Sequence, residues 1–109
     1  MGKTYLGEFE ELVLTIVALL NDDAYGNSIV KAIKAHQDRT VNLSAVHVTL
    51  YRLEDKGFVK SDIGGATNER GGRRKRYFHI TNTGIALRKE IKTSRTELWN
   101  MIPKLQFST

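Results

Sequence analysis

The spacing of hydrophobic residues predicts a run of helices in the first half of the chain. In the first segment, apolar residues recur every three or four positions, as on the buried face of a helix: Phe9, Leu12, Val13, Ile16, Val17 and Leu20. We therefore expect a helix over residues 6–20. A second helix is expected over residues 24–37, where Ile29, Ala32 and Ile33 fall on one face.

A third predicted helix is short and has clear signals at both ends. Its buried face has apolar residues spaced by four and then three positions: Val46, Leu50 and Leu53. Ser44 belongs to the residue types that cap helix N-termini, and residues 40–43 before it fit a small strand or an extended link. Gly57 suits the left-handed conformation that often ends a helix. The sequence therefore predicts a compact helix with a polar outer face.

Two segments after the third helix have the alternation of a β-hairpin. Residues 58–63 and 73–80 predict its two strands, because successive side chains of a strand point to opposite faces. Three helices followed by a hairpin is the order of a winged helix-turn-helix. We therefore predict a mainly α fold with a small β-sheet, in which residues 1–81 form this unit.

The remainder of the chain, residues 82–109, predicts a dimerisation helix capped by Thr81. A near-heptad pattern, with Ser94 in its seam, runs through Leu87, Ile91, Leu98, Ile102 and Leu105. A helix of about 20 residues extends about 30 Å, which exceeds the width of a small winged-helix core. We therefore favour an interface between two copies of the chain over the alternative, in which this face packs back onto its own domain.

Composition fits one domain and points to an anionic partner. The chain has 109 residues and a formal charge of +5, and five of its 17 basic residues lie within residues 70–76. It has no cysteine, which excludes disulfides and thiolate metal sites. No apolar run is long enough to span a bilayer and no signal-peptide pattern is present, so we expect a cytoplasmic protein without membrane contact.

The winged-helix order places candidate DNA contacts on two elements. The third helix can enter the major groove of double-stranded DNA, and its outward side chains are His47, Val48, Tyr51 and Arg52. Ser44 and Thr49 are further candidates for phosphate contact. The hairpin supplies Arg73, Arg74, Lys75 and Arg76, whose cationic side chains suit phosphates or a narrow minor groove. These ten residues form the predicted DNA-binding set.

Several stretches, in this order, resemble the PadR family of transcriptional regulators. They are Tyr25-Gly26, residues 46–57 (VHVTLYRLEDKG), residues 71–78 (GGRRKRYF) and Thr81 with Gly84. The resemblance implies a dimer held by the C-terminal helix, binding to a pseudo-palindromic operator, usually repression, and often a small aromatic or drug-like effector. His47 and Val48 occupy positions that are often Tyr and Pro in the family, which leaves the operator sequence open.

Other functions find less support in the residues. No nucleophile with a base and an orienting group can be assembled, so we predict no enzyme activity and no cofactor. The three histidines lie on different predicted elements without metal-ligand spacing, so no metal site is expected. Trp99 is expected in the dimer interface, where two copies could also stack a planar aromatic ligand. The main alternative is a winged-helix module that binds an acidic protein partner instead of DNA.

Overall fold

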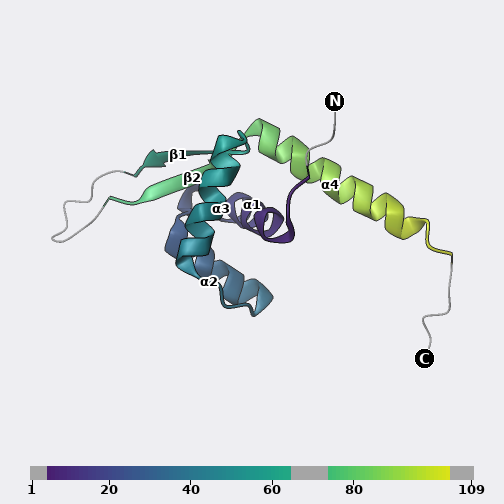
Figure 1. The fold of residues 1–109 in the computed structure, drawn as a ribbon, viewed down its shortest axis with the longest axis horizontal. Helices are drawn as coiled ribbons and strands as arrows, with labels where there is room; N and C mark the ends of the chain where they lie inside the picture. Colours follow the sequence, from purple (N-terminus) through teal and green to yellow (C-terminus); the bar gives the residue numbers. More distant parts are fainter. Residues whose placement is uncertain (1–4, 65–73, 104–109) are drawn as a thin grey trace.

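The computed structural model describes residues 5–64 and 74–103, and these form the mainly helical fold with a small hairpin that the sequence predicts (Figure 1). The elements follow one another as α1 (Glu8–Leu20), the 3-10 turn η1 (Asn21–Asp23), α2 (Gly26–Gln37), α3 (Leu43–Asp55), β1 (Val59–Ile63), β2 (Arg76–Ile80) and α4 (Asn82–Asn100). The two strands are antiparallel, with Ser61 opposite Phe78. This order and pairing are those of a winged helix with one additional helix.

The core lies where α1, α2, α3 and the hairpin meet. Its largest fully buried side chains include Leu14, Ile29, Leu50 and Phe78, one from each of these parts of the fold. Burying a Leu, Ile or Phe side chain stabilises a fold by roughly 1.5–3 kcal/mol. The helical periodicity seen in the sequence is therefore the pattern of side chains that this core removes from water.

The start of α3 differs from the prediction. Asn42, and not Ser44, is the N-cap, because its side-chain oxygen accepts hydrogen bonds from the backbone N–H groups of Ser44 (2.7 Å) and Ala45 (3.4 Å). Leu43 is already helical, and residues 40–42 are an extended link and not a strand. Asn is as strong an N-cap residue as Ser, so the local sequence allowed either start.

Gly57 and the hairpin fix the exit from α3. Gly57 has a φ of 83°, in the left-handed region that favours glycine, as predicted. β2 begins at Arg76, later than the predicted residue 73, and Arg73 lies outside the described residues. The backbone N–H of Phe78 donates to the carbonyl of Ala24 at 2.8 Å, which joins β2 to the turn between α1 and α2. The hairpin is thus attached to the helical core along its second strand.

The first half of α4 is fixed to the rest of the chain. Thr81 caps it as predicted, since its hydroxyl accepts from the N–H of Gly84 at 3.0 Å and donates to the carbonyl of Gly57 at 2.7 Å. A Cβ added at Gly84 would lie 2.2 Å from the Phe58 carbonyl oxygen, so only glycine permits this close approach.

Leu87 was predicted to lie in a dimer interface, but it is 9% exposed and belongs to the core of its own chain. Ile91 also packs against this core. The predicted stripe therefore begins within the domain, because the first turns of α4 cross α1.

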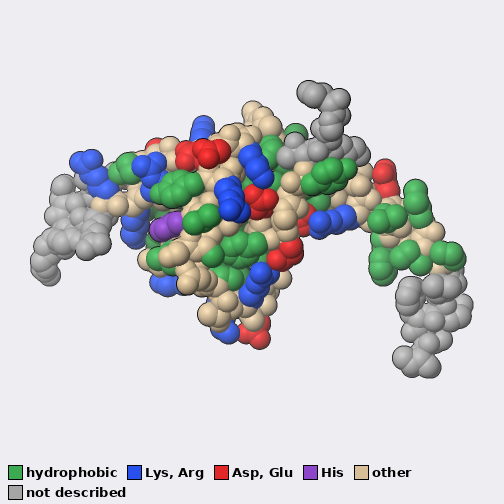
Figure 2. All heavy atoms as spheres, viewed as in Figure 1, with side chains coloured by type: hydrophobic (Ala, Val, Ile, Leu, Met, Phe, Trp, Pro, Cys, Tyr) green, Lys and Arg blue, Asp and Glu red, His purple; other side chains and the backbone are tan. Residues whose placement is uncertain are grey.

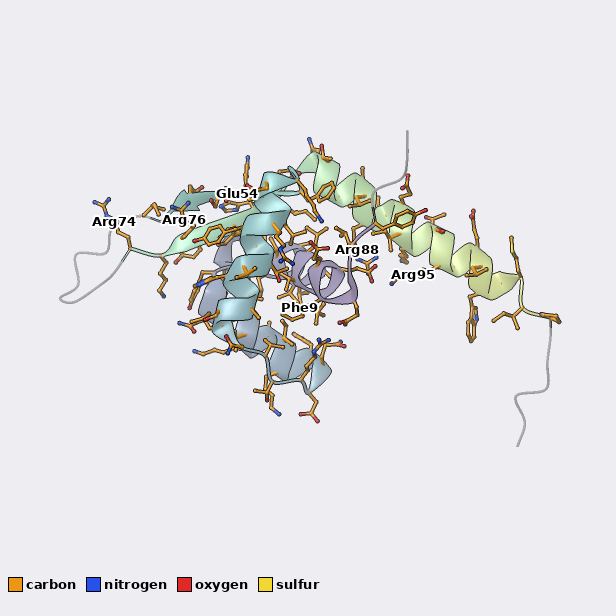
Figure 3. The ribbon with its side chains drawn as sticks, viewed as in Figure 1. Phe9, Glu54, Arg74, Arg76, Arg88 and Arg95 are labelled. Carbon is orange, nitrogen blue, oxygen red and sulfur yellow. The ribbon has the colours of Figure 1, made fainter. Side chains whose placement is uncertain are left out.

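Two polar contacts extend the attachment of α4 to α1. Arg88 Nε donates to the hydroxyl of Thr15 at 2.7 Å, and Arg95 pairs with the carboxylate of the buried Glu11. Figure 3 shows both arginines extending from α4 toward α1. Beyond Arg95 the helix leaves the domain and continues to Asn100, three residues before Pro103 (Figure 1). Pro103 has no backbone N–H to donate to the carbonyl of Trp99, in agreement with a helix that ends before it.

Candidate nucleic-acid interface

The outer face of α3 presents most of the side chains that the sequence predicted. Val48 is 51% exposed and Tyr51 47% exposed. Ser44 and Arg52 are exposed as well, and His47 is half-buried. Thr49 is only 5% exposed, so direct phosphate contact by its hydroxyl, which the sequence predicted, does not fit the structure. The reason is that Thr49 follows Val46 by three positions and shares its buried face.

A cleft separates α3 from the start of the second hairpin strand. It has a volume of about 390 Å³ and is lined by His47 and Tyr51 from α3, by residues 25–27 at the start of α2, and by Arg74, Lys75 and Arg76. The last three are exposed. The structure thus brings these three cations and the outer face of α3 to one surface. Figure 2 shows Lys and Arg side chains gathered along the hairpin.

Aromatic rings connect the walls of this cleft. Tyr51 meets Phe78 edge to face, with ring centroids 6.1 Å apart, and Tyr25 meets Tyr77 in the same way at 5.5 Å. Such pairs stabilise by about 0.5–1.5 kcal/mol beyond the area they bury. Tyr25 and Tyr77 were absent from the predicted site. The alternation of the second strand, which places Tyr77 and Phe78 on opposite faces, could have indicated Tyr77, and the Tyr25-Gly26 motif could have indicated Tyr25.

Gly26 allows α2 to approach α3 at the cleft. A Cβ at this position would lie 2.4 Å from Nε2 of His47 and 2.9 Å from Cδ1 of Leu43. The imidazole of His47 therefore occupies the space that a side chain at residue 26 would fill. This contact restricts the orientation of His47, which the sequence identified only as an outward residue.

Arg76 differs from its neighbours because its guanidinium is linked through a hydroxyl group to a carboxylate of α3. Its Nη1 donates to the hydroxyl of Ser61 at 2.9 Å, and that hydroxyl donates to Oε2 of Glu54 at 2.6 Å. Arg76 and Glu54 lie near one another in Figure 3, while Arg74 lies further out along the hairpin. These two hydrogen bonds join the hairpin to the C-terminal half of α3 and place the carboxylate of Glu54 near Arg76.

The acidic first turn of α1 is paired with basic residues. Glu8 pairs with Arg39 at 2.8 Å and Glu10 with Lys56 at 3.0 Å. Burial raises the pKa of Glu10, but the hydrogen bond from the Gly7 N–H and the ammonium of Lys56 together hold that pKa below its ordinary value. These pairs join α1 to the link before α3 and to the residue that ends α3.

The far half of α4 has a different character. Leu98 is 67%, Trp99 64% and Ile102 40% exposed, and these are three of the residues predicted for the dimer interface or the ligand site. Met101, which the sequence analysis did not single out, is 74% exposed. Ser94 is also exposed, and Leu105 lies outside the described residues. Figure 2 shows hydrophobic side chains gathered at the far end of the helix.

Comparison with solved structures identifies the fold. The chain is similar to a PadR-like transcription factor from Bacteroides fragilis, with a TM-score of 0.71 and 21% identity over 86% of this chain and 85% of that one. It is also similar to a PadR-like regulator from Bacillus cereus, with a TM-score of 0.70 and 20% identity over 93% of both chains. A PadR family regulator from Clostridium difficile gives 0.70 and 24% identity, over 86% of this chain and 93% of that one. No curated protein sequence matches significantly.

These similarities define the fold as a winged helix with one additional helix. The model of the transcriptional regulator PadR-like family matches residues 13–101, and the chain belongs to that family. The resemblance seen in the sequence is thereby confirmed. DNA binding and transcriptional regulation are the functions of this family. Among the described residues, no helix is both long and apolar enough to cross a membrane.

Proposed function

We propose that this chain is a homodimeric repressor that binds a specific double-stranded DNA operator through α3 and the hairpin. The observation that supports this most is the shared cleft, which His47 and Tyr51 line together with Arg74 and Lys75. A major groove admits one α-helix, and cationic side chains beside that helix can bind the flanking phosphates. Base contacts from α3 supply the sequence preference, and the hairpin supplies much of the affinity.

The exposed end of α4 supports a dimer. Four large apolar side chains, Leu98, Trp99, Met101 and Ile102, lie within five residues of one another and are 40–74% exposed. A contiguous apolar surface of this kind is usually covered by a partner. A second copy of the same helix has the same apolar surface, so a two-fold pairing covers both. Two α3 helices would then enter successive major grooves of a pseudo-palindromic site, about 34 Å apart.

The position of Trp99 supports an effector of planar aromatic shape. Trp99 is the only tryptophan of the chain and lies beside Leu98 on the apolar end of α4. In the proposed dimer two such rings come close to the two-fold axis, where they can stack a flat ligand. Because a single tryptophan reports on this location, titration with planar aromatic compounds should quench its fluorescence. An unchanged emission with every such compound would remove the effector from the proposal.

Selection of bound duplexes from a random pool tests the DNA-binding proposal directly. We expect an enriched motif with two inverted half-sites, and an affinity that falls steeply as salt increases from 50 to 200 mM. The alternative function, a module that binds an acidic protein, predicts no enrichment and no duplex binding even at low salt. A single enriched half-site without its inverted copy would contradict the dimer and leave the DNA contact intact.

A further inference from the structure

Lys75 is the one described cation of the hairpin whose charge lies over an aromatic ring. Its Nζ is 4.3 Å from the centroid of the Tyr25 ring, within the range of a cation–π interaction. The ring is itself held in place, because Tyr77 packs edge to face against it and the Tyr25 N–H donates to the Ser28 hydroxyl at 2.9 Å. The ammonium therefore rests on a platform that belongs to the start of α2 and not to the hairpin.

This platform differs in kind from the contact made by Arg76. Arg76 is linked through Ser61 to the carboxylate of Glu54, and a nearby anion reduces the positive potential that a phosphate would meet. The Tyr25 ring is neutral, so it orders Lys75 without cancelling its charge. Of these two neighbouring cations, Lys75 is therefore the one that is both ordered and available to an anion.

Ordering in advance matters for a lysine. Its side chain has four rotatable bonds, and restricting them on binding costs conformational entropy. A side chain that is already held at the ligand's position loses less conformational entropy on binding. Lys75 lines the same cleft as His47 and Tyr51, so an ammonium held there faces the DNA that α3 would engage.

From this geometry we propose that Tyr25 is a positioning residue for DNA binding. Its ring holds the Lys75 ammonium at the cleft between α3 and the hairpin, so that a backbone phosphate meets an ordered cation. The inference rests on the proposed function, because it concerns how the same surface binds DNA. Tyr25 acts through Lys75, and its hydroxyl has no part in the proposed contact.

A double-mutant cycle on the full-length chain tests this role. The variants are Tyr25→Leu, Lys75→Met and their combination, each measured for affinity to the selected duplex. We expect Tyr25→Leu to weaken binding by about two- to fivefold, the effect of an exposed cation–π contact. In the Lys75→Met background the same change should have no further effect. Tyr25→Phe keeps the ring and should bind as the wild type does.

Two results would overturn the proposal. Equal losses from Tyr25→Leu with and without Lys75 would show that the tyrosine acts independently of the lysine. A loss in Tyr25→Phe as large as in Tyr25→Leu would assign the role to the hydroxyl. Thermal unfolding of each variant shows whether a change in affinity reflects a change in stability. Because Tyr25→Leu is present in both backgrounds of the cycle, its effect on stability cancels from the comparison.

An NMR measurement tests the contact without DNA and without the leucine variant. Protons above the face of an aromatic ring resonate upfield, so the ε-methylene protons of Lys75 should be shifted upfield in the wild type and in Tyr25→Phe. Unshifted protons in the wild type would overturn the proposal. If the wild type binds no duplex at all while the shift is present, the proposed function fails and not the contact between the two side chains.

Discussion

The hairpin and the far half of α4 both extend from the same helical core, but they expose different chemistry. The start of the second hairpin strand, away from the core, exposes Arg74, Lys75 and Arg76. The end of α4 and the residues just after it expose Leu98, Trp99 and Ile102. Charged side chains remain in water at little cost, but contiguous apolar side chains on a soluble domain usually belong to an interface. The hairpin surface is therefore suited to bind an anion, and the end of α4 is suited to pack against another apolar surface.

The two extensions also differ in how firmly they are held. The hairpin is joined to the core by the hydrogen bond from Phe78 to Ala24 and by two edge-to-face aromatic pairs. Beyond Arg95, the described residues 96–103 are all exposed. A partner at the end of α4 could therefore act on the rest of the molecule through the first half of α4, where Leu87 and Ile91 pack on the core and Arg88 and Arg95 contact α1.

The largest expected effect comes from charging the apolar end of α4. Leu98→Glu combined with Ile102→Glu should give a monomer, because two carboxylates would be buried in the proposed interface. Loss of the second half-site contact should then weaken operator binding by about a hundredfold or more. Sedimentation measures the oligomeric state, and a binding titration measures the affinity.

The matched control places the same two charges elsewhere on the helix. Thr93 and Thr96 are exposed, and the period of 3.6 residues puts them on the side of α4 opposite Leu98. Thr93→Glu combined with Thr96→Glu should leave the dimer intact. A dimer that persists in the Leu98 and Ile102 variant would show that the two chains associate elsewhere.

A smaller effect should separate the cations of the hairpin. Arg74→Ala should weaken binding to all duplexes about equally and lower the slope of log affinity against log salt by about 0.9, the value for one phosphate contact. Arg76→Ala should lower the slope less, because Glu54 lies near Arg76 through Ser61. Lys60→Ala, which removes an exposed charge that does not line the cleft, is the control and should leave the slope unchanged. Equal slopes for the Arg74 and Arg76 variants would contradict the distinction.

His47 should affect which sequence is bound more than how tightly DNA is held. His47→Ala should change the preference at one or two base positions by about fivefold, near the lower end of what one side chain contributes to discrimination. Gly26→Ala should act in the same direction, because its Cβ would displace the imidazole. Repeating the duplex selection with each variant measures the preference. A lower salt slope with unchanged preference would assign His47 to phosphate contact instead.

The smallest expected effect concerns stability and its dependence on pH. The pKa of Glu10 is lowered in the folded chain by the Gly7 N–H and by Lys56, so its ionised carboxylate stabilises the fold above the ordinary carboxyl value of 4.5. This contribution is lost as the pH falls through the folded-state pKa. Glu10→Gln should therefore cost up to about 1 kcal/mol at pH 7 and progressively less below pH 4.5. Chemical unfolding at a series of pH values checks this, and a cost that stays constant at low pH would contradict it.

The sequence by itself determined the elements and the family. Hydrophobic spacing located the four helices, and the alternation of residues 73–80 indicated a strand, which begins at Arg76 in the structure. Gly57 and Thr81 marked an end and a start that the structure bears out. These features depend on local periodicity and on the conformational preferences of single residues. The family resemblance rested on several motifs in one order, of which residues 71–78 were the most specific.

Only the tertiary structure decided which residues meet across elements. It placed Leu87 in the core of its own chain, removed Thr49 from the exposed surface and brought Tyr25 under Lys75, which are 50 residues apart in the sequence. Periodicity shows which side of a helix is apolar, but it does not show what covers that side. What covers the apolar side depends on how α4 packs on α1 and on how the hairpin lies against the start of α2. Packing between distant segments sets both.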